Sequence, residues 1–112
     1  MISIGVVSLN NVKYMELLIK GLRRNTVNPF ELLVHCNCIS PEFKELMCAN
    51  EDILKAFGYS SFNKYIAAPA NNLFSQATGD YFVFLDDDVY PAPGWDQALL
   101  NKVNPKIKCQ YL

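Results

Sequence analysis

The chain has 112 residues, of which 51% are hydrophobic, so it is long and apolar enough for one domain with its own core. Its 10 basic and 11 acidic residues give a formal net charge of −1, which leaves no basic excess to attract nucleic acid or an anionic membrane. No apolar run approaches the roughly 20 residues that a membrane-spanning helix needs, so we expect no transmembrane segment.

The first part of the chain alternates strand-like and helix-like segments. Residues 2–8 are mainly β-branched and apolar, which is typical of a buried strand. A helix is expected from a cap at Asn10 or Asn11 to about Arg24, and a second apolar strand over residues 30–36. Helical spacing places four apolar residues on the inner face of that helix: Tyr14, Leu17, Leu18 and Leu22.

The middle of the chain predicts one or two further helices. Ser40 is expected to cap a helix with Pro41 at its first position and Glu42 in its first turn, which suits the helix dipole. Residues 50–52 resemble a second helix start, and Gly58 a helix stop. The remaining expected elements are a weak strand over 62–67, a helix over 69–78, a strand over 80–85, a helix over 94–103 and a strand over 107–112.

Strands that alternate with helices predict an α/β fold with a mostly parallel sheet flanked by helices. In such sheets ligands bind beyond the carboxyl ends of the strands. That rule brings residues 8–10, residues 36–37 and residues 86–88 to one crevice. The sequence has no linker, repeat or low-complexity segment, so we expect residues 1–112 to form a single domain.

The acidic run Asp86, Asp87 and Asp88 directly follows the apolar segment 81–85. Three adjacent carboxylates repel one another strongly at low dielectric, and oxygen ligands suit Mg²⁺ or Mn²⁺. The run therefore indicates a divalent cation that carries a phosphorylated ligand. Strand alternation puts Asp86 and Asp88 on one face as the metal ligands and turns Asp87 to the other. The alternative is a solvated turn with a capping role.

The four cysteines, Cys36, Cys38, Cys48 and Cys109, match neither a zinc site nor a disulfide framework. Buried free cysteines act as small hydrophobic residues, and reduced thiols are typical of the cytoplasm. The N-terminal segment has no basic leader or small-residue cleavage site. We therefore expect a cytoplasmic protein.

The motifs, taken in order, resemble the nucleotide-binding half of a family 2-type glycosyltransferase with a GT-A, Rossmann-like fold. Residues 2–11 resemble the opening strand with its Asn-rich turn, and residues 31–34 the second strand. Asn71 precedes Gly79-Asp80-Tyr81 as the Asn of the family's Arg-Asn segment does. Residues 84–88, followed by Pro91, Pro93, Gly94 and Trp95, resemble the DXD metal motif and its turn.

The resemblance implies metal-dependent binding of a UDP- or GDP-type nucleotide-sugar donor for glycosyl transfer. Asp88 would be the principal ligand of Mn²⁺ or Mg²⁺, and Asp86 would contact the metal or the ribose. Ser8 and Leu9 would flank the base, and Cys36 and Asn37 occupy base-reading positions. The full set of implied nucleotide contacts is Ser8, Leu9, Asn10, Cys36, Asn37, Asn71, Asp86 and Asp87.

The chain also departs from the family pattern. Cys36 stands where an Asp is frequent, Ala70 where an Arg is common, and Leu73 where a Gly is common. The family's acceptor half, with its catalytic base, follows the metal motif. We expect that half to be absent here, with base and acceptor unknown, so whether the chain is an enzyme by itself stays open.

The departures motivate an alternative, a non-catalytic domain that keeps the fold for binding or assembly. A nucleotidyltransferase is a weaker rival, because the sequence has no Gly-rich phosphate loop. A sheet left uncovered on one side predicts exposed apolar surface and therefore a homo-oligomer.

Overall fold

The computed structural model describes residues 1–103, in which strands and helices alternate along the chain. The elements in order are β1 (Ile2–Ser8), α1 (Val12–Asn25), β2 (Phe30–Cys36), α2 (Pro41–Ala49), β3 (Leu54–Tyr59), α3 (Ala67–Gln76), β4 (Tyr81–Asp86) and α4 (Trp95–Leu100). The predicted strand over 107–112 lies outside the described residues.

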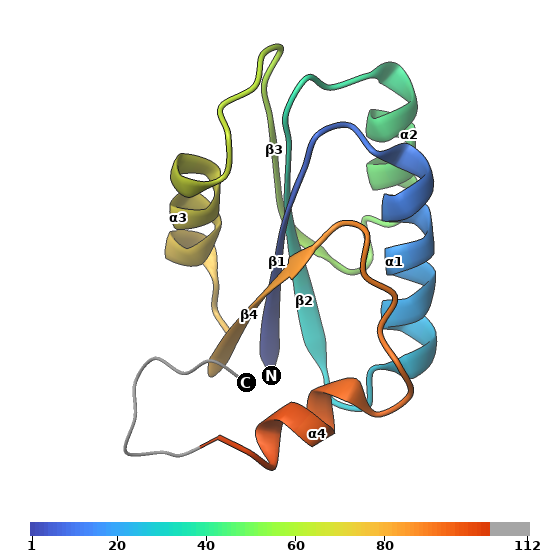
Figure 1. Ribbon diagram of the computed structural model, residues 1–112, viewed down its shortest axis with the longest axis vertical. Coiled ribbons are helices and arrows are strands. Elements are labelled where there is room, and N and C mark those ends of the chain that lie inside the picture. The colour runs from blue at the N-terminus through green and yellow to red at the C-terminus, as the bar shows by residue number, and fades with distance from the viewer. Residues whose placement is uncertain (104–112) are drawn as a thin grey trace.

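The four strands form one parallel sheet in the order β3-β2-β1-β4. Figure 1 shows α1 and α2 on one face of this sheet, α3 on the other, and α4 beneath the end where the strands begin. Since β1 pairs with both β2 and β4, the carboxyl ends of all three strands lie together. The predicted α/β fold with a parallel sheet flanked by helices is confirmed.

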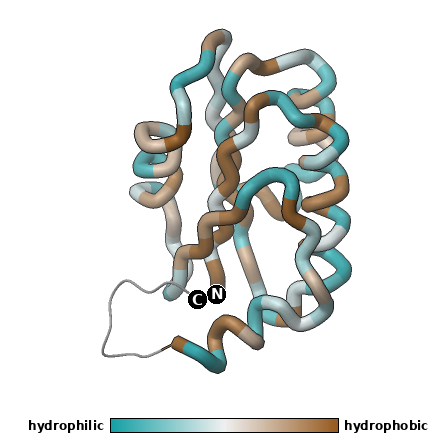
Figure 2. Tube along the Cα trace, viewed as in Figure 1, coloured by the Kyte–Doolittle hydropathy of each residue, from teal (hydrophilic) through white to brown (hydrophobic). Residues whose placement is uncertain are grey.

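The core lies between the sheet and the α1–α2 layer. Alternate residues of β1, namely Ile2, Ile4 and Val6, point into it and are at most 2% exposed. Figure 2 shows the hydrophobic residues concentrated along the strands and the inward sides of the helices. Both faces of β1 and β2 are covered, which explains why these two segments are apolar almost throughout.

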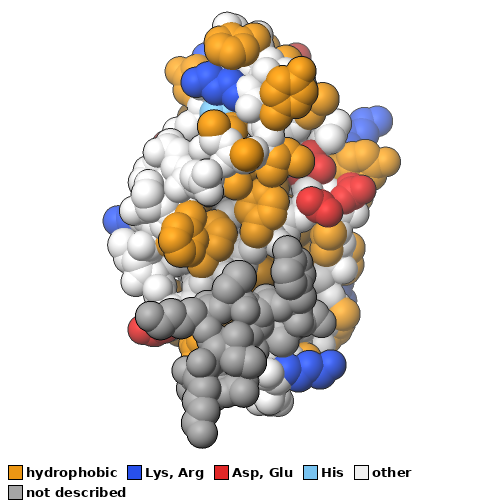
Figure 3. All heavy atoms as spheres, turned by 60° about the vertical axis from the view of Figure 1, so that its left-hand side comes forward, with side chains coloured by type: hydrophobic (Ala, Val, Ile, Leu, Met, Phe, Trp, Pro, Cys, Tyr) orange, Lys and Arg blue, Asp and Glu red, His pale blue; other side chains and the backbone are white. Residues whose placement is uncertain are grey.

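On the opposite face of the sheet, the contact with α3 is closely packed but leaves apolar side chains exposed. Gly5 in β1 leaves room for the Phe82 ring, because a Cβ there would lie 2.5 Å from that ring. Phe82 in turn packs edge-on against Phe74 of α3, with ring centroids 5.1 Å apart. Phe74 itself is 63% exposed. Figure 3 looks onto this side of the molecule and shows hydrophobic side chains gathered on its surface.

The region between α2 and α3 corrects the sequence-based expectation. Residues 50–53 form a turn instead of a second helix start, and Gly58 lies within β3 instead of ending a helix. The predicted strand over 62–67 is also wrong, because that segment is the loop into α3. Gly58 suits β3 because a Cβ there would lie 3.3 Å from Nδ1 of His35 on the neighbouring strand.

The helix signals were partly right. Ser40 caps α2 by accepting a hydrogen bond from the Phe43 backbone N–H, and Pro41 follows it, as predicted. Asn11 occupies the cap position of α1 but makes no side-chain cap hydrogen bond. The inner face of α1 is rotated from the prediction: Tyr14 and Leu17 are exposed, and the buried apolar residues are Met15, Leu18, Ile19 and Leu22.

Among residues 1–103, no helix is both long enough and apolar enough to cross a membrane.

Candidate functional site

An open cleft of about 520 Å³ lies at the carboxyl edge of the sheet. The end of β1, the end of β4 and the loop between β3 and α3 contribute its walls. Its lining residues are Val7, Ser8, Leu9, Asn11, Asn37, Asn63, Tyr65, Ile66, Asp86, Asp87 and Asp88. The crevice predicted from the topology is therefore present, and it contains the whole acidic run.

Asp87 joins the two strands that border the cleft. Its Oδ2 accepts hydrogen bonds from Ser8 Oγ at 2.7 Å and from Asn11 Nδ2 at 2.8 Å. Ser8 Oγ also accepts a bond from the Asn11 backbone N–H at 3.2 Å. Strand alternation predicted that Asp87 points to the other face from Asp86 and Asp88, but all three residues line the cleft. The reason is that β4 ends at Asp86, so strand alternation does not continue through the turn that follows.

Asp86 and Asp88 differ from Asp87 in being exposed. Within residues 1–103 the side chain of neither forms a hydrogen bond or an ion pair. No group of three or more His, Cys, Asp or Glu side chains in this part of the chain is arranged to hold a metal ion. Asp86 and Asp88 supply hard carboxylate oxygens, which fit Mg²⁺ or Mn²⁺ when further oxygen ligands come from water and a bound phosphate.

Asn37 anchors the wall opposite the acidic run. It is 2% exposed, and its Oδ1 lies 3.1 Å from each of three donors: His35 Nε2, Ser60 Oγ and the Lys64 backbone N–H. Its Nδ2 donates to the Tyr65 carbonyl at 2.9 Å. Burial lowers the pKa of His35, so the ring is neutral near pH 7. Asn37 thus shapes the cleft by holding the loop that carries Tyr65.

Three predicted site residues lie outside the lining. Asn10 has a left-handed backbone, with φ of 54°, and its Oδ1 accepts bonds from the Ser40 backbone N–H and hydroxyl. Cys36 is fully buried, and burial raises the pKa of its thiol to about 11. Asn71 is exposed on α3. Their contacts with a nucleotide stay sequence predictions.

Several lining residues were missed by the sequence reading, chiefly Asn11, Asn63, Tyr65 and Ile66. The last three follow β3, the strand that was predicted several residues too late. A correct placement of β3 would have put them at the same edge of the sheet as the acidic run. Asn63 and Tyr65 are the polar and aromatic residue types that commonly line ligand clefts.

The family model for glycosyl transferase family 2 matches residues 3–106. No curated protein sequence gives a significant match. Among solved structures, S. aureus TarS residues 1–349 superposes with a TM-score of 0.76 at 22% sequence identity. That superposition covers 89% of this chain and 31% of TarS 1–349.

Two further similar structures contain ligands. One is the same TarS fragment in complex with UDP-GlcNAc, with a TM-score of 0.76 and 22% identity over 89% of this chain and 30% of that one. The other is the mannosyltransferase PcManGT from Pyrobaculum calidifontis with GDP-Man and Mn²⁺, with a TM-score of 0.70 and 16% identity. It covers 87% of this chain and 30% of PcManGT.

At 16–22% sequence identity these similarities establish the fold alone. The chain spans about a third of the length of these structures. The family model covers nearly all of the chain, and the resemblance read from its motifs is confirmed. The chain belongs to glycosyl transferase family 2.

Proposed function

We propose that the cleft binds the diphosphate of a nucleotide-sugar donor together with Mn²⁺ or Mg²⁺, and that the chain is the donor-binding part of a glycosyltransferase. The observation that carries this proposal is the pair of exposed carboxylates, Asp86 and Asp88, on either side of a fixed Asp87 in one cleft. Support also comes from similar structures that hold UDP-GlcNAc, or GDP-Man with Mn²⁺.

The chain's own residues have separate tasks in this proposal. Asp86 and Asp88 would hold the cation, which when bound stabilises negative charge on the departing diphosphate. Asp87 positions the turn, since its Oδ2 is already bonded to Ser8 and Asn11. Its role as a nucleotide contact stays a prediction. The base that deprotonates the acceptor hydroxyl is not assigned to any residue of this chain.

Calorimetric titration with UDP-GlcNAc and GDP-mannose, with and without Mn²⁺, tests the proposal. We expect binding that requires the metal and that is lost in Asp88→Asn. Glu45→Gln is the matched control, because it neutralises an exposed carboxylate on α2 outside the cleft. Wild-type protein that binds neither donor in the presence of Mn²⁺ would contradict donor binding.

The second candidate is a non-catalytic binding or assembly domain. The fully buried Cys36, with its neutral thiol at a predicted base-reading position, favours it, because a buried thiol cannot read the base. Turnover separates the two candidates. Release of sugar from either donor, abolished by Asp88→Asn, would exclude the non-catalytic domain.

We also propose that residues 1–112 act as one domain and that the protein works in the cytoplasm. Cys36, Cys38 and Cys48 are free thiols, which suits a reducing compartment. Protease digestion would test the first point, since a single domain gives one resistant fragment. Localisation of the tagged protein would test the second.

We further propose self-association through β4. This strand lies at the edge of the described sheet, and its Tyr81 and Phe84 are 44% and 39% exposed. An apolar strand at the edge of a sheet favours pairing with a second chain. Sedimentation velocity should show a concentration-dependent dimer, and a single monomer peak at high concentration would refute self-association.

A further inference from the structure

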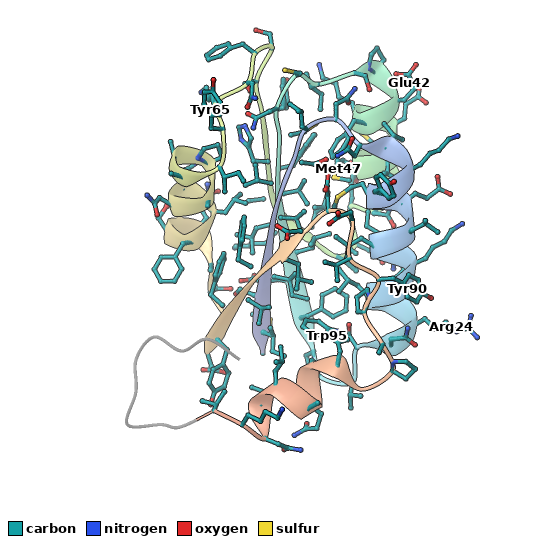
Figure 4. The ribbon with its side chains drawn as sticks, viewed as in Figure 1. Arg24, Glu42, Met47, Tyr65, Tyr90 and Trp95 are labelled. Carbon is teal, nitrogen blue, oxygen red and sulfur yellow. The ribbon has the colours of Figure 1, made fainter. Side chains whose placement is uncertain are left out.

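Tyr65 occupies an unusual position on the rim of the cleft. Among residues 1–103 it is the only aromatic residue that lines the cleft, and 75% of its surface is exposed. Figure 4 shows it on the loop that leads into α3. Within residues 1–103 its ring forms neither an aromatic pair nor a cation–π contact. Packing within the described chain therefore gives no reason for an aromatic side chain here.

The backbone of Tyr65 makes this residue type more surprising. Its φ is 62°, in the left-handed region that glycine adopts freely and that an aromatic residue rarely adopts. Two hydrogen bonds hold it there: its N–H donates to Asn63 Oδ1 at 2.8 Å, and its carbonyl accepts from Asn37 Nδ2 at 2.9 Å. Strained backbone that the surroundings fix in this way is typical of ligand-contacting positions.

The two residues at the predicted base-reading positions have little capacity to recognise a base edge. Asn37 Oδ1 already faces three donors, and the Cys36 thiol is buried. Leu9, which follows the neighbouring strand β1, is exposed and its side chain has no hydrogen-bonding group. On this side of the cleft Tyr65 provides a planar, largely apolar ring on which a base can stack.

The spacing of the sheet agrees with a nucleotide that spans the cleft. Asn37, which holds Tyr65, follows β2, whereas the acidic run follows β4, and β1 lies between them. Two strand spacings separate these ends by about 10 Å. A nucleoside diphosphate with its phosphates beside Asp86 and Asp88 would extend its base toward Tyr65.

We propose that Tyr65 stacks on the nucleobase of the donor and so determines how this protein recognises the base. The inference rests on the proposed donor binding and adds a residue to it. Every base has a π-face, so recognition by stacking tolerates different bases. UDP and GDP are therefore expected to bind with similar affinity.

Three variants separate stacking from a structural role. Tyr65→Phe keeps the ring, Tyr65→Gly removes both the ring and the strained backbone, and Phe62→Ala removes a comparably exposed ring from the same loop outside the cleft. Each is titrated with UDP, GDP and inorganic diphosphate, which has no base, in the presence of Mn²⁺. Thermal unfolding of each is measured in parallel.

Stacking predicts that Tyr65→Gly weakens UDP and GDP binding by about 5- to 100-fold and leaves diphosphate binding unchanged. Its melting temperature should be equal to or above that of the wild type, because the left-handed strain is relieved. Tyr65→Phe and Phe62→Ala should bind all three probes as the wild type does.

Wild-type affinity of Tyr65→Gly for both nucleotides would overturn the role of Tyr65 and leave donor binding intact. Loss of diphosphate binding together with a lower melting temperature would mean that Tyr65 is structural, and would also overturn it. A wild-type protein that binds no nucleotide would overturn donor binding and the Tyr65 role together.

Discussion

The two ends of β1 carry the same arrangement of hydrogen-bonding groups but differ in how fully these groups are bonded. At the amino end, Ser3 Oγ donates to Glu31 Oε1 at 2.6 Å and accepts from the Gly79 backbone N–H at 2.8 Å. At the carboxyl end, Ser8 Oγ donates to Asp87 Oδ2 at 2.7 Å and accepts from the Asn11 backbone N–H at 3.2 Å. Each serine links β1 to one carboxylate and one turn.

The two carboxylates differ in how fully they are bonded. Both oxygens of Glu31 accept hydrogen bonds, three of which come from the backbone and hydroxyl of Thr78, and Glu31 is 9% exposed. Asp87 uses only Oδ2 among the described residues and lines the open cleft. The carboxylate at the amino end is therefore fully bonded, whereas the one at the carboxyl end keeps an oxygen that accepts no hydrogen bond from the described residues.

The largest effect expected from this difference is on ligand affinity. The double variant D86N/D88N should weaken Mn²⁺-dependent UDP binding by at least about 100-fold, because both proposed metal ligands lose their charge. Its stability should equal or exceed that of the wild type, since repulsion among three adjacent carboxylates is reduced. Calorimetry and urea unfolding measure the two quantities, and a large loss of stability would show that the carboxyl end is also structural.

The reverse pattern is expected at the amino end. Glu31→Gln should lower the free energy of unfolding by about 2 kcal/mol, because a buried acceptor of charge-assisted hydrogen bonds is replaced by an amide that also carries donors. UDP affinity should not change. Urea unfolding against Glu45→Gln, an exposed control, measures the effect, and an equal stability of the two variants would disprove it.

Asp87 should fall between these extremes. Asp87→Asn should cost about 1 kcal/mol of stability and weaken UDP binding severalfold, because the turn that carries Asp86 and Asp88 is tied less firmly to β1. A double-mutant cycle with Ser8→Ala isolates the Ser8–Asp87 bond. Strictly additive effects of the two changes would mean that this bond does not couple the strands.

The smallest effect concerns acid sensitivity. Burial alone would raise the pKa of Glu31, but its hydrogen bonds from Ser3 and Thr78 outweigh burial and hold it below the usual 4.5. A carboxylate whose pKa is lowered in the folded state makes its full contribution to folding stability at pH values above its unfolded pKa. That contribution is lost as the pH falls through the folded pKa. Stability should therefore decline below about pH 4.5, and less steeply in Glu31→Gln. Equal slopes in urea titrations at several pH values would count against this.

Asp96 contributes to the same acid sensitivity. It is 1% exposed, and bonds from the backbone N–H groups of Val27 and Asn28 and from the Asn28 side chain overcome the effect of burial and lower its pKa. These bonds fasten α4 to the segment before β2. Since the group also belongs to the amino end, it reinforces the structural character of that end.

The central strands, and the place of the acidic run at the end of a strand, could be predicted because both depend on the local sequence pattern. β1 and β2 are apolar on both faces, and Asp86 to Asp88 directly follow an apolar run. β3 could not be located, because its residues are mostly half-buried and it owes its strand conformation to pairing with β2. The loop with Tyr65 was therefore misplaced as well.

The role of Asp87 was hidden for a different reason. Strand alternation predicts its direction only as far as the strand lasts, and β4 stops one residue earlier. Asp87 accepts a hydrogen bond from the Ser8 hydroxyl, and Ser8 is 79 positions away in the sequence. A single sequence gives the distance along the chain but not this proximity, so only the three-dimensional structure revealed the bond.

Trp95 is an intrinsic fluorescence probe that reports only on its own surroundings. It is the single tryptophan, it packs against the core at the start of α4, and its Nε1 donates to Thr26 Oγ1 at 3.0 Å. Figure 4 shows Trp95 and Tyr65 at opposite ends of the molecule. Intrinsic tryptophan fluorescence should therefore report undocking of α4 during unfolding and remain constant when the cleft is filled, so an unchanged emission spectrum in a ligand titration is no sign of an empty cleft.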